Sequence, residues 1–215
     1  ELVRNGVIGK IKNVDISVGD PGRPCDLKKE DIEPGLNWNL WCGPAPLRGY
    51  SSILSPRGIH NHFPAWRNYM EYGGGMITDW GAHHVDIATW ALGMDGEGQG
   101  PVSIDGTDAK HPVDFKNGFP VVEDCYNTAN DFNVVCKFDN GVEMHVTSRG
   151  DNGIKFDGTK GRMFVNRGKI VGKPVEENWD EGQFTDEDVQ ALYKDKPHEG
   201  HKNNFYRCIS EGGLP

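Results

Sequence analysis

The stretch NDFNVVCKFDNGVEMHVTS, residues 130–148, decides the fold of this chain. Apolar and polar side chains alternate along both of its halves, and a period of two residues is typical of a β-strand with one buried face. The halves meet at Asp139-Asn140-Gly141, whose Asn-Gly pair predicts a tight type I′ turn because both residues tolerate positive φ. The stretch therefore predicts an antiparallel hairpin with these side chains on its buried face: Phe132, Val134, Cys136, Phe138, Val142, Met144 and Val146.

Three further segments complete the predicted fold. Val14, Ile16 and Val18 alternate with polar residues, which predicts an opening strand. Residues 153–172 predict short strands broken by glycines, and residues 198–210 predict a closing helix. Because these segments show no alternating βαβ rhythm, we expect an α+β fold, with an open, mostly antiparallel β-sheet and helices packed on one face.

Residues 20–72, by contrast, are rich in proline, glycine and aromatic side chains and have no sustained period. We expect a long loop excursion there, with at most short helical turns, inside a single domain that spans residues 1–215. Uncovered loops of this length usually carry function. The excursion and the segment after it hold five of the six tryptophans: Trp38, Trp41, Trp66, Trp80 and Trp90.

The stretch EYGGGMITDWGAHHVDIATWAL, residues 71–92, predicts a helix that starts near Gly75 or Met76 and ends at Gly93. At about 100° per residue, its side chains fall into two stripes. The first stripe suits packing on the sheet: Ile77, Gly81, Val85, Ala88 and Leu92. The second is mostly polar: Asp79, His83, Asp86 and Trp90.

The polar stripe has two interpretations. In the structural one, Asp79 caps the helix, His83 hydrogen-bonds to Asp79, and Asp86 is solvated. In the functional one, the stripe faces a ligand. The three glycines at 73–75 favour the second interpretation, because glycine costs roughly 1 kcal/mol of conformational entropy and is usually tolerated where a backbone or ligand must approach closely.

Composition excludes several classes of protein. The formal net charge of −9 and the pI near 5.3 would repel nucleic acid and anionic membranes. No apolar run approaches the roughly 18 residues of a membrane span. The five cysteines are scattered and never in C-x-x-C spacing, which indicates reduced, structural thiols. His60 and His62 have the spacing of a metal pair, but the loop offers no third ligand nearby, so we expect no metal.

Residues 73–90, GGGMITDWGAHHVDIATW, resemble the G-G-G-x-x-x-D-x-G-x-H-x-x-D signature in the C-terminal domain of the glucose-fructose oxidoreductase, inositol dehydrogenase and rhizopine-catabolism (Gfo/Idh/MocA) family. GLNWNLWCGPAP, residues 35–46, and NNFYRCISEGGLP, residues 203–215, are similar to further landmarks of that family. The resemblance therefore extends over nearly the whole chain.

The resemblance implies an NAD(P)-dependent oxidoreductase acting on a hydroxyl of a sugar, polyol or related carbohydrate. Such an enzyme has an N-terminal Rossmann domain for NAD or NADP, followed by a domain for substrate and oligomer contacts. We expect only the second domain here, because the nearest glycine-rich text, GEGQG at 96–100, follows a helix and precedes a strand. The chain alone should therefore bind no dinucleotide and be inactive.

The resemblance also implies partners and location. We expect a homo-oligomer formed through the open sheet face, and no nucleic-acid or membrane partner. The outward set of the central hairpin is moderately polar: Asn133, Val135, Lys137, Glu143, His145 and Thr147. Relatives are usually cytoplasmic, and export to the periplasm stays open because the chain starts without a methionine.

Site roles follow from the same resemblance. His83 is the expected general base, since an imidazole exchanges protons near neutral pH. Asp79 is expected to orient that imidazole and to bind a neighbouring hydroxyl. Trp66 can offer a flat apolar surface to a sugar ring, and Arg67 can bond hydroxyls or a carboxylate. His84 and Asp86 complete the candidate substrate-binding set, although His84 points about 100° away from His83 and can instead pack structurally.

Three alternatives stay open at this point. Relatives of the same architecture use tightly held NAD to cleave glycosides, so a hydrolase or lyase could use the same residues. A metal-dependent hydrolase could take Asp79, His83 and Asp86 as ligands, together with His60 or His62. A non-catalytic binding or assembly module is the third alternative, which the Asp-x-x-x-His pairing disfavours.

Overall fold

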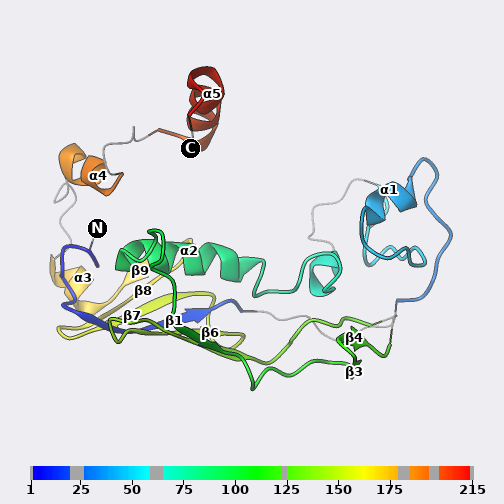
Figure 1. Cartoon of the computed structure of the whole chain (residues 1–215), viewed down its shortest axis with the longest axis horizontal. Helices are drawn as coiled ribbons and strands as arrows, with labels where there is room; N and C mark the ends of the chain where they lie inside the picture. The colour runs from blue at the N-terminus through cyan, green and yellow to red at the C-terminus, as the bar shows by residue number, and fades with distance from the viewer. Residues whose placement is uncertain are drawn as a thin grey trace.

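The computed structural model describes residues 2–19, 27–58, 65–122, 125–178, 185–193 and 199–213. Its main feature is a seven-stranded sheet with the strand order β2-β5-β6-β1-β7-β8-β9, and helix α2 lies across one face of it (Figure 1). Every pair of neighbouring strands is antiparallel except β1 and β6. The predicted α+β class is confirmed. The strands are β1 (Ile11–Ser17), β2 (Ser103–Asp105), β5 (Asn133–Lys137), β6 (Glu143–Thr147), β7 (Gly153–Gly158), β8 (Arg162–Val165) and β9 (Ile170–Val171).

The predicted hairpin is the pair β5 and β6. Val134 lies opposite Val146, and Cys136 lies opposite Met144, on the face that packs into the core. The type I′ prediction for its turn is wrong, because only Gly141 has positive φ. The Gly141 amide donates to the Phe138 carbonyl at 3.1 Å, which makes this a three-residue loop whose last residue alone is left-handed.

A second Asn-Gly pair adopts the conformation that the first does not. Asn117 and Gly118 have φ values of 53° and 81° between the short strands β3 (Phe115–Lys116) and β4 (Phe119–Pro120). The two-residue connection requires both residues to be left-handed, as in a type I′ turn. Loop length therefore decides the turn type, and the dipeptide alone does not.

Strand β1 is the centre of the sheet. It pairs in parallel with β6 and antiparallel with β7. The predicted alternation is confirmed, since Val14, Ile16 and Val18 are fully buried. They form one core with side chains of β5 to β8 and with Ala88 of α2. The first strand of the chain thus lies in the middle of the sheet, between two strands that come much later in the sequence.

Helix α2 (Trp80–Leu92) starts several residues later than predicted. Gly74 and Gly75 both have positive φ, and the amides of Thr78 and Asp79 both donate to the Gly75 carbonyl, so residues 76–79 form turns. Ile77 therefore lies outside the helix and is exposed, contrary to the packing stripe. The rest of that stripe faces the sheet, with Gly81 and Ala88 buried and Val85 and Leu92 partly buried. The predicted C-cap, Gly93, is left-handed with φ of 71°.

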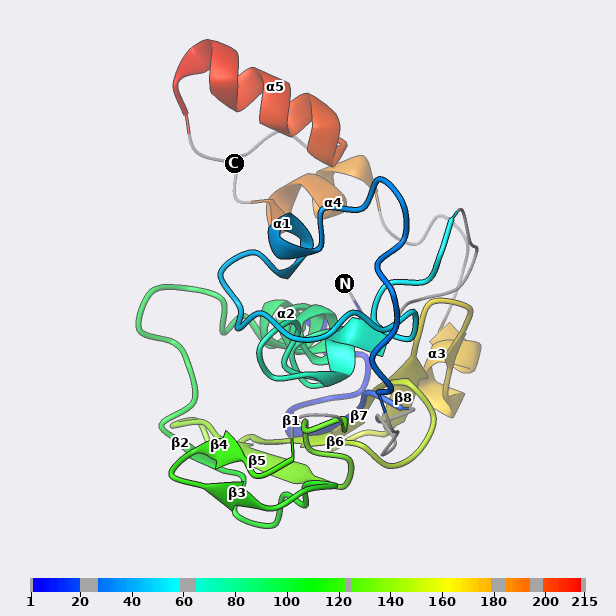
Figure 2. The same cartoon turned by 90° about the vertical axis from the view of Figure 1, so that its right-hand side faces the viewer.

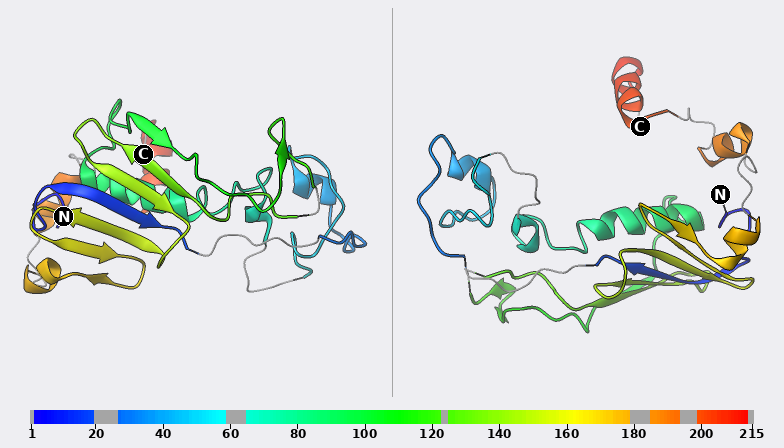
Figure 3. Two further views of the ribbon diagram at one scale, coloured as in Figure 1. Left: turned by 90° about the horizontal axis from the view of Figure 1, so that it is seen from below. Right: turned by 180° about the vertical axis from the view of Figure 1, so that it is seen from behind.

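The excursion after β1 has a core of its own. Within its described part, the predicted short helical turns are α1 (Trp38–Cys42) and the 3₁₀ turn η1 (Ala65–Asn68). The indole of Trp38 stacks on Trp41 with ring centroids 4.4 Å apart. Figures 1 and 3 show this part beyond one end of the sheet. Its buried cluster is separate from that of the sheet: Leu27, Trp38, Cys42, Tyr50, Leu54 and Tyr69.

Three helices follow the sheet: α3 (Lys173–Asn178), α4 (Asp186–Leu192) and the predicted closing helix α5 (His201–Glu211). Helix α3 packs against β8 and β9, and Tyr193, directly after α4, meets the ring of Trp90 on α2 with centroids 6.0 Å apart. Figure 2 shows α4 and α5 on the same side of the sheet as α2. The predicted packing of helices on one face of the sheet is therefore confirmed for α2, which contacts β1 and β7.

The described cysteines are free thiols: Cys42, Cys125, Cys136 and Cys208. Burial raises the pKa of the Cys136 thiol, which makes it less reactive. The prediction of reduced, structural thiols is confirmed for these four, and Cys25 lies outside the described residues.

The other face of the sheet carries no helix in the described part of the chain, as the left view of Figure 3 shows. Its side chains form ion pairs, both between neighbouring strands and within β7. Lys155 Nζ lies 2.6 Å from Asp15 and 3.1 Å from Asp157, and the hydrogen bond to Asp15 raises the pKa of Lys155. Lys137 pairs with Glu143 at 3.4 Å. The face is polar and internally charge-paired.

We predict that Asp131→Asn weakens the fold in a pH-dependent way. Hydrogen bonds from Arg149 (2.7 Å) and Lys110 (3.2 Å) lower the pKa of the Asp131 carboxyl at the start of β5. A lowered folded-state pKa gives stability that is present above the unfolded value of about 3.9 and lost as the pH falls through the folded value. Urea unfolding at pH 7 and at pH 3 should show the variant less stable at pH 7, with the difference shrinking at pH 3.

Asp139→Asn in the hairpin turn is the matched control, because Asp139 forms no ion pair among the described residues. Equal effects of the two substitutions at pH 7 would contradict the assigned role of Asp131.

Candidate functional site

A close backbone approach positions the residues around the start of α2. The Gly75 amide donates to the Arg67 carbonyl at 2.7 Å. A Cβ added at Gly73 would lie 2.7 Å from Arg67 Cα, and one added at Gly75 would lie 2.8 Å from Thr128 Cβ. Both separations are too short for any side chain, so glycine is required at these positions. The glycine run therefore places η1 against the start of α2.

Arg67 and Asp79 meet at this junction. Arg67 Nε lies 2.6 Å from Asp79 Oδ2, with the two side chains 21% and 30% exposed. Asp79 holds the N-cap position of α2, but its side chain makes no capping hydrogen bond. The guanidinium of Arg67 also lies over the Trp66 ring, 5.2 Å from its centroid. Three predicted site residues, Trp66, Arg67 and Asp79, are thus brought together.

His83 lies on the exposed face of α2, one turn after Asp79. Its ring meets Trp80 edge-on with centroids 6.1 Å apart. No hydrogen bond joins it to Asp79 within the described residues, because the carboxylate turns to Arg67 instead. Asp86 is exposed one turn further along. The structure therefore presents His83 outward beside the Arg67–Asp79 pair, without the expected orienting contact.

His84 has a different environment although it adjoins His83. It is only 2% exposed, and its Nε2 lies 2.7 Å from Asn152 Oδ1. Asn152 Nδ2 donates to the Val18 carbonyl at 3.1 Å, so the amide oxygen faces His84 and the imidazole Nε2 acts as the donor. The side chain thus joins α2 to the end of β1. The structure places His84 in the core and apart from the exposed stripe.

We predict that alanine substitutions of the two adjacent histidines differ greatly in their effect on stability. His84→Ala removes a buried hydrogen bond and leaves a cavity, so the free energy of unfolding should fall by about 2–4 kcal/mol. His83→Ala truncates an exposed side chain and should change stability by no more than about 0.5 kcal/mol. Urea denaturation followed by circular dichroism measures both. A large loss of stability in His83→Ala would show that its side chain supports the fold.

Sequence reasoning missed the polar network that holds the 66–72 segment. Arg48 forms an ion pair with Glu71, whose second carboxylate oxygen accepts from Asn127 Nδ2 at 3.0 Å. Asn127 is buried and its Oδ1 accepts from the Met70 amide at 2.8 Å. Thr128 donates to the Asn68 carbonyl at 3.2 Å. The network joins three segments that are distant in sequence, at residue 48, residues 68–71 and residues 127–128. No periodic pattern in the sequence indicates these contacts.

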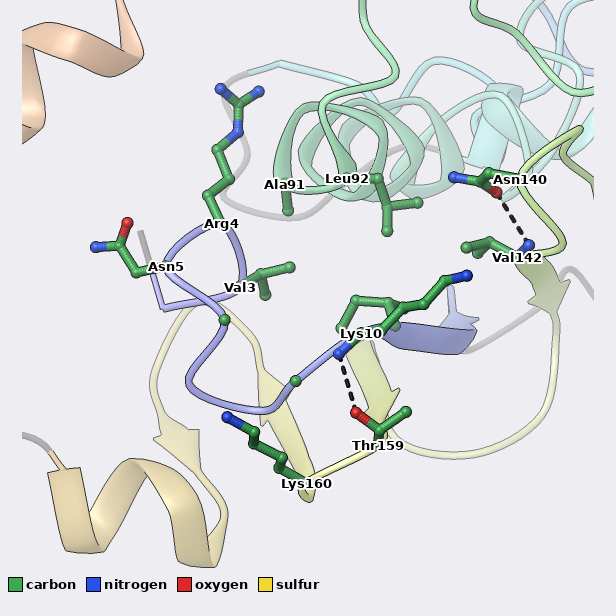
Figure 4. Close-up of a pocket in the computed structure, with 13 residues that line it drawn as sticks. Val3, Arg4, Asn5, Lys10, Ala91, Leu92, Asn140, Val142, Thr159 and Lys160 are labelled. Atoms are coloured by element: carbon green, nitrogen blue, oxygen red, sulfur yellow. Dashed lines mark hydrogen bonds between the residues drawn. The ribbon is translucent and has the colours of Figure 1, made fainter.

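A cavity of about 670 Å³ lies at the other end of α2 (Figure 4). Its lining includes Ala91 and Leu92 of the helix, together with Arg4, Lys10 and Lys160, and none of the predicted site residues. Arg4 Nε donates to the Trp90 carbonyl at 3.0 Å, and a cation is favourable at the carboxyl end of a helix. The Lys10 side chain extends across the cavity beneath Leu92 (Figure 4). These cations complement the helix terminus.

Metal ligands and a dinucleotide-binding loop are the two further features that an enzyme site could contain. Within the described ranges, no group of three or more histidine, cysteine or acidic side chains is placed to hold a metal ion. His60 and His62 lie outside the described residues. The glycines of residues 96–100 connect α2 to β2, which differs from the strand-to-helix loop that cradles a pyrophosphate. These glycines therefore do not form a loop of the dinucleotide-binding kind.

Comparison with known proteins agrees with the resemblance in the sequence. Residues 21–175 match the model of the Gfo/Idh/MocA oxidoreductase family, C-terminal alpha/beta domain. A crystal structure of an oxidoreductase from Thermotoga maritima is similar, with 18% sequence identity and a TM-score of 0.42, over 99% of this chain and 48% of that one. The chain thus spans about half the length of that protein. No curated protein matches the chain. None of the described helices is both long and apolar enough to cross a bilayer.

Proposed function

Since this chain belongs to the Gfo/Idh/MocA oxidoreductase family, we propose that it supplies the substrate-binding and proton-transfer side chains of an NAD(P)-dependent enzyme acting on a carbohydrate hydroxyl. The observation that carries the proposal is the exposed His83 on a regular helix, one turn from the Arg67–Asp79 pair. A helix is a rigid support, and rigid support is what a proton-transfer group needs.

His83 acts as the general base in this proposal. Its imidazole forms no hydrogen bond to another described residue, so a ring nitrogen is available to accept the proton of a substrate hydroxyl. Removal of that proton lets the carbon that bears the hydroxyl release a hydride and become a carbonyl. NAD or NADP would accept that hydride, and in this proposal a part of the enzyme other than the glycines of residues 96–100 would hold it, because those glycines lie between a helix and a strand.

Arg67, Asp79 and Trp66 bind the substrate in this proposal. Asp79 Oδ2 pairs with Arg67, which leaves Oδ1 to accept from a hydroxyl next to the reacting one. The Asp79 carboxylate and the Trp66 ring hold the Arg67 guanidinium in a fixed orientation. In this proposal Asp79 accepts a hydrogen bond from one hydroxyl of a neutral vicinal diol, and the second hydroxyl lies beside Arg67.

In the complete enzyme, we expect His83→Ala to lower kcat by about 10²- to 10⁴-fold and to leave the Kd for NAD or NADP nearly unchanged. Asp79→Asn keeps the shape of the side chain but releases Arg67, so it should raise KM more than it lowers kcat. The assay follows nicotinamide absorbance with a panel of sugars and polyols. His201→Ala on α5 is the control, since His201 is exposed at a distance from this site and should retain full activity.

Normal turnover by His83→Ala would refute the general-base role. Equal losses in His83→Ala and His201→Ala would point to a non-specific effect on the protein and would equally refute it.

We also propose that the open face of the sheet is the contact surface for a second copy of the chain. The outward side chains of β5 and β6 are of mixed polarity, with Val135 of β5 directly opposite His145 of β6. Ion pairs such as Lys155–Asp15 already neutralise much of its charge, which lowers the cost of covering it.

Val135→Asp places a carboxylate on that face, opposite His145, and should convert dimer to monomer in multi-angle light scattering of the complete enzyme. Val121→Asp, at an exposed position outside the main sheet, is the control and should leave the mass unchanged. An unchanged mass for both variants would rule out this face as the contact surface.

A further inference from the structure

A second cavity, of about 340 Å³, lies within the aromatic excursion. Three rings line it, those of Trp41, Trp66 and Tyr72, and the carboxylate of Glu71 lines it as well. The main chain from Cys42 to Ala45 completes the wall. We call this cavity the aromatic cup. Its volume lies at the low end of the range of about 300–1,000 Å³ for small-molecule sites, which suits a single ring.

The rings of the cup are held rigidly by their neighbours. Trp41 stacks on Trp38 at 4.4 Å on one side and meets the edge of Tyr72 at 5.2 Å. The guanidinium of Arg67 lies over Trp66, and that of Arg48 lies over Tyr72 at 5.6 Å. Rigid aromatic surfaces lose little entropy when a ligand binds to them.

The cup presents no net charge to a ligand. Glu71 is 17% exposed, and its two carboxylate oxygens are taken by Arg48 and by Asn127. Burial raises the pKa of the Tyr72 phenol, which therefore keeps its proton and hydrogen-bonds to the Cys42 sulfur. A cationic ligand would need an unpaired carboxylate or open ring faces, and here Arg48 already satisfies the carboxylate and covers Tyr72. The lining thus favours a neutral ligand.

Two of the side chains that line the cup, Trp41 and Trp66, also carry an indole N–H donor. The indole N–H groups of Trp41 and Trp66 donate to no other residue in the described part of the chain, whereas that of Trp38 donates to the Arg48 carbonyl at 2.7 Å. Aromatic faces with a few N–H donors complement a ring that carries C–H bonds on its faces and hydroxyls at its edge. Such a ring is a pyranose or a cyclitol.

We propose that the aromatic cup binds one neutral, hydroxylated ring of a carbohydrate, separate from the ring that reacts at His83. Arg67, Asp79 and His83 do not line the cup, so a ring inside it does not touch the proton-transfer residues. Trp66 joins the two places, because it lines the cup and also supports Arg67. Binding of a ring in the cup does not depend on the proposed function. The further statement that this ring is part of the enzyme's substrate does rest on the proposed function. The substrate is then a glycoside or oligosaccharide with one unit in each place.

The test is ligand-observed NMR with the 215-residue chain and no cofactor. The probes are methyl β-D-glucopyranoside, methyl β-D-galactopyranoside and myo-inositol, with mannitol as an acyclic polyol and tetramethylammonium as a cation. At least one cyclic probe should bind, with millimolar affinity, and mannitol and tetramethylammonium should not. Absence of binding by every cyclic probe, or binding of tetramethylammonium in their place, would overturn the proposal.

Two variants locate the binding. Trp66→Leu removes a wall of the cup and should weaken binding about tenfold, since loss of one ring surface costs on the order of 1–2 kcal/mol. Ala45→Trp fills the cup without truncating any side chain and should abolish binding. Trp90→Leu, a partly exposed tryptophan on α2 that lies outside the cup, is the matched control and should bind as the original chain does.

His83→Ala separates this proposal from the proposed function. Binding of the cyclic probe should be unchanged in His83→Ala, because that side chain does not line the cup. Loss of binding in this variant would mean that the ring lies at His83, and the second subsite would be refuted. Failure of the proposed function appears instead as normal turnover of His83→Ala in the complete enzyme, whatever the binding result.

Discussion

The arrangement of the whole molecule depends on the close backbone contact at Gly73 and Gly75. Neither glycine has room for a Cβ, since Arg67 crowds one and Thr128 crowds the other. The contact fixes the aromatic excursion to the start of α2 and to the segment that leads into β5. The contact thereby joins two separate hydrophobic clusters, that of the sheet and that of the aromatic excursion. The same contact positions Arg67 against Asp79.

The two faces of helix α2 have different roles, since one packs on the sheet and the other carries the candidate catalytic residue. Its buried side carries His84, which bonds through Asn152 to β1, and its exposed side carries His83. Two identical residue types in adjacent positions thus differ in role because a helix turns by about 100° per residue. The buried histidine fixes the rotation of α2 on the sheet, and that rotation decides the direction in which His83 points.

Much of the sheet and the exposure of the polar stripe could be predicted from the sequence, because a period of two or of 3.6 residues records which side chains are buried. The alternation of Val14, Ile16 and Val18 is such a record. Local conformation at glycines was harder to predict. Gly74 and Gly75 delay the start of α2, and the turn at 139–141 takes three residues where the Asn-Gly pair suggested two. The partner of Asp79 could not be predicted at all, since an i,i+4 histidine competes with an arginine from another segment, and only the folded backbone brings that arginine within reach.

The charges near the aromatic cup and near the Arg67–Asp79 pair indicate that both sites suit a neutral, hydroxylated ligand. The chain has a net charge of −9, yet each acidic side chain at the junction is paired with an arginine, Asp79 with Arg67 and Glu71 with Arg48. Each arginine also lies over an aromatic ring, which fixes the guanidinium and the ring together. Buried pairs of this kind gain little net stability, because desolvation cancels most of the attraction. Their effect is instead to fix the orientation of hydrogen-bond donors and acceptors and to leave the site without net charge. A charged ligand would have to compete with these pairs, whereas a polyhydroxylated ring can bond to their edges and pack on their aromatic neighbours without breaking them.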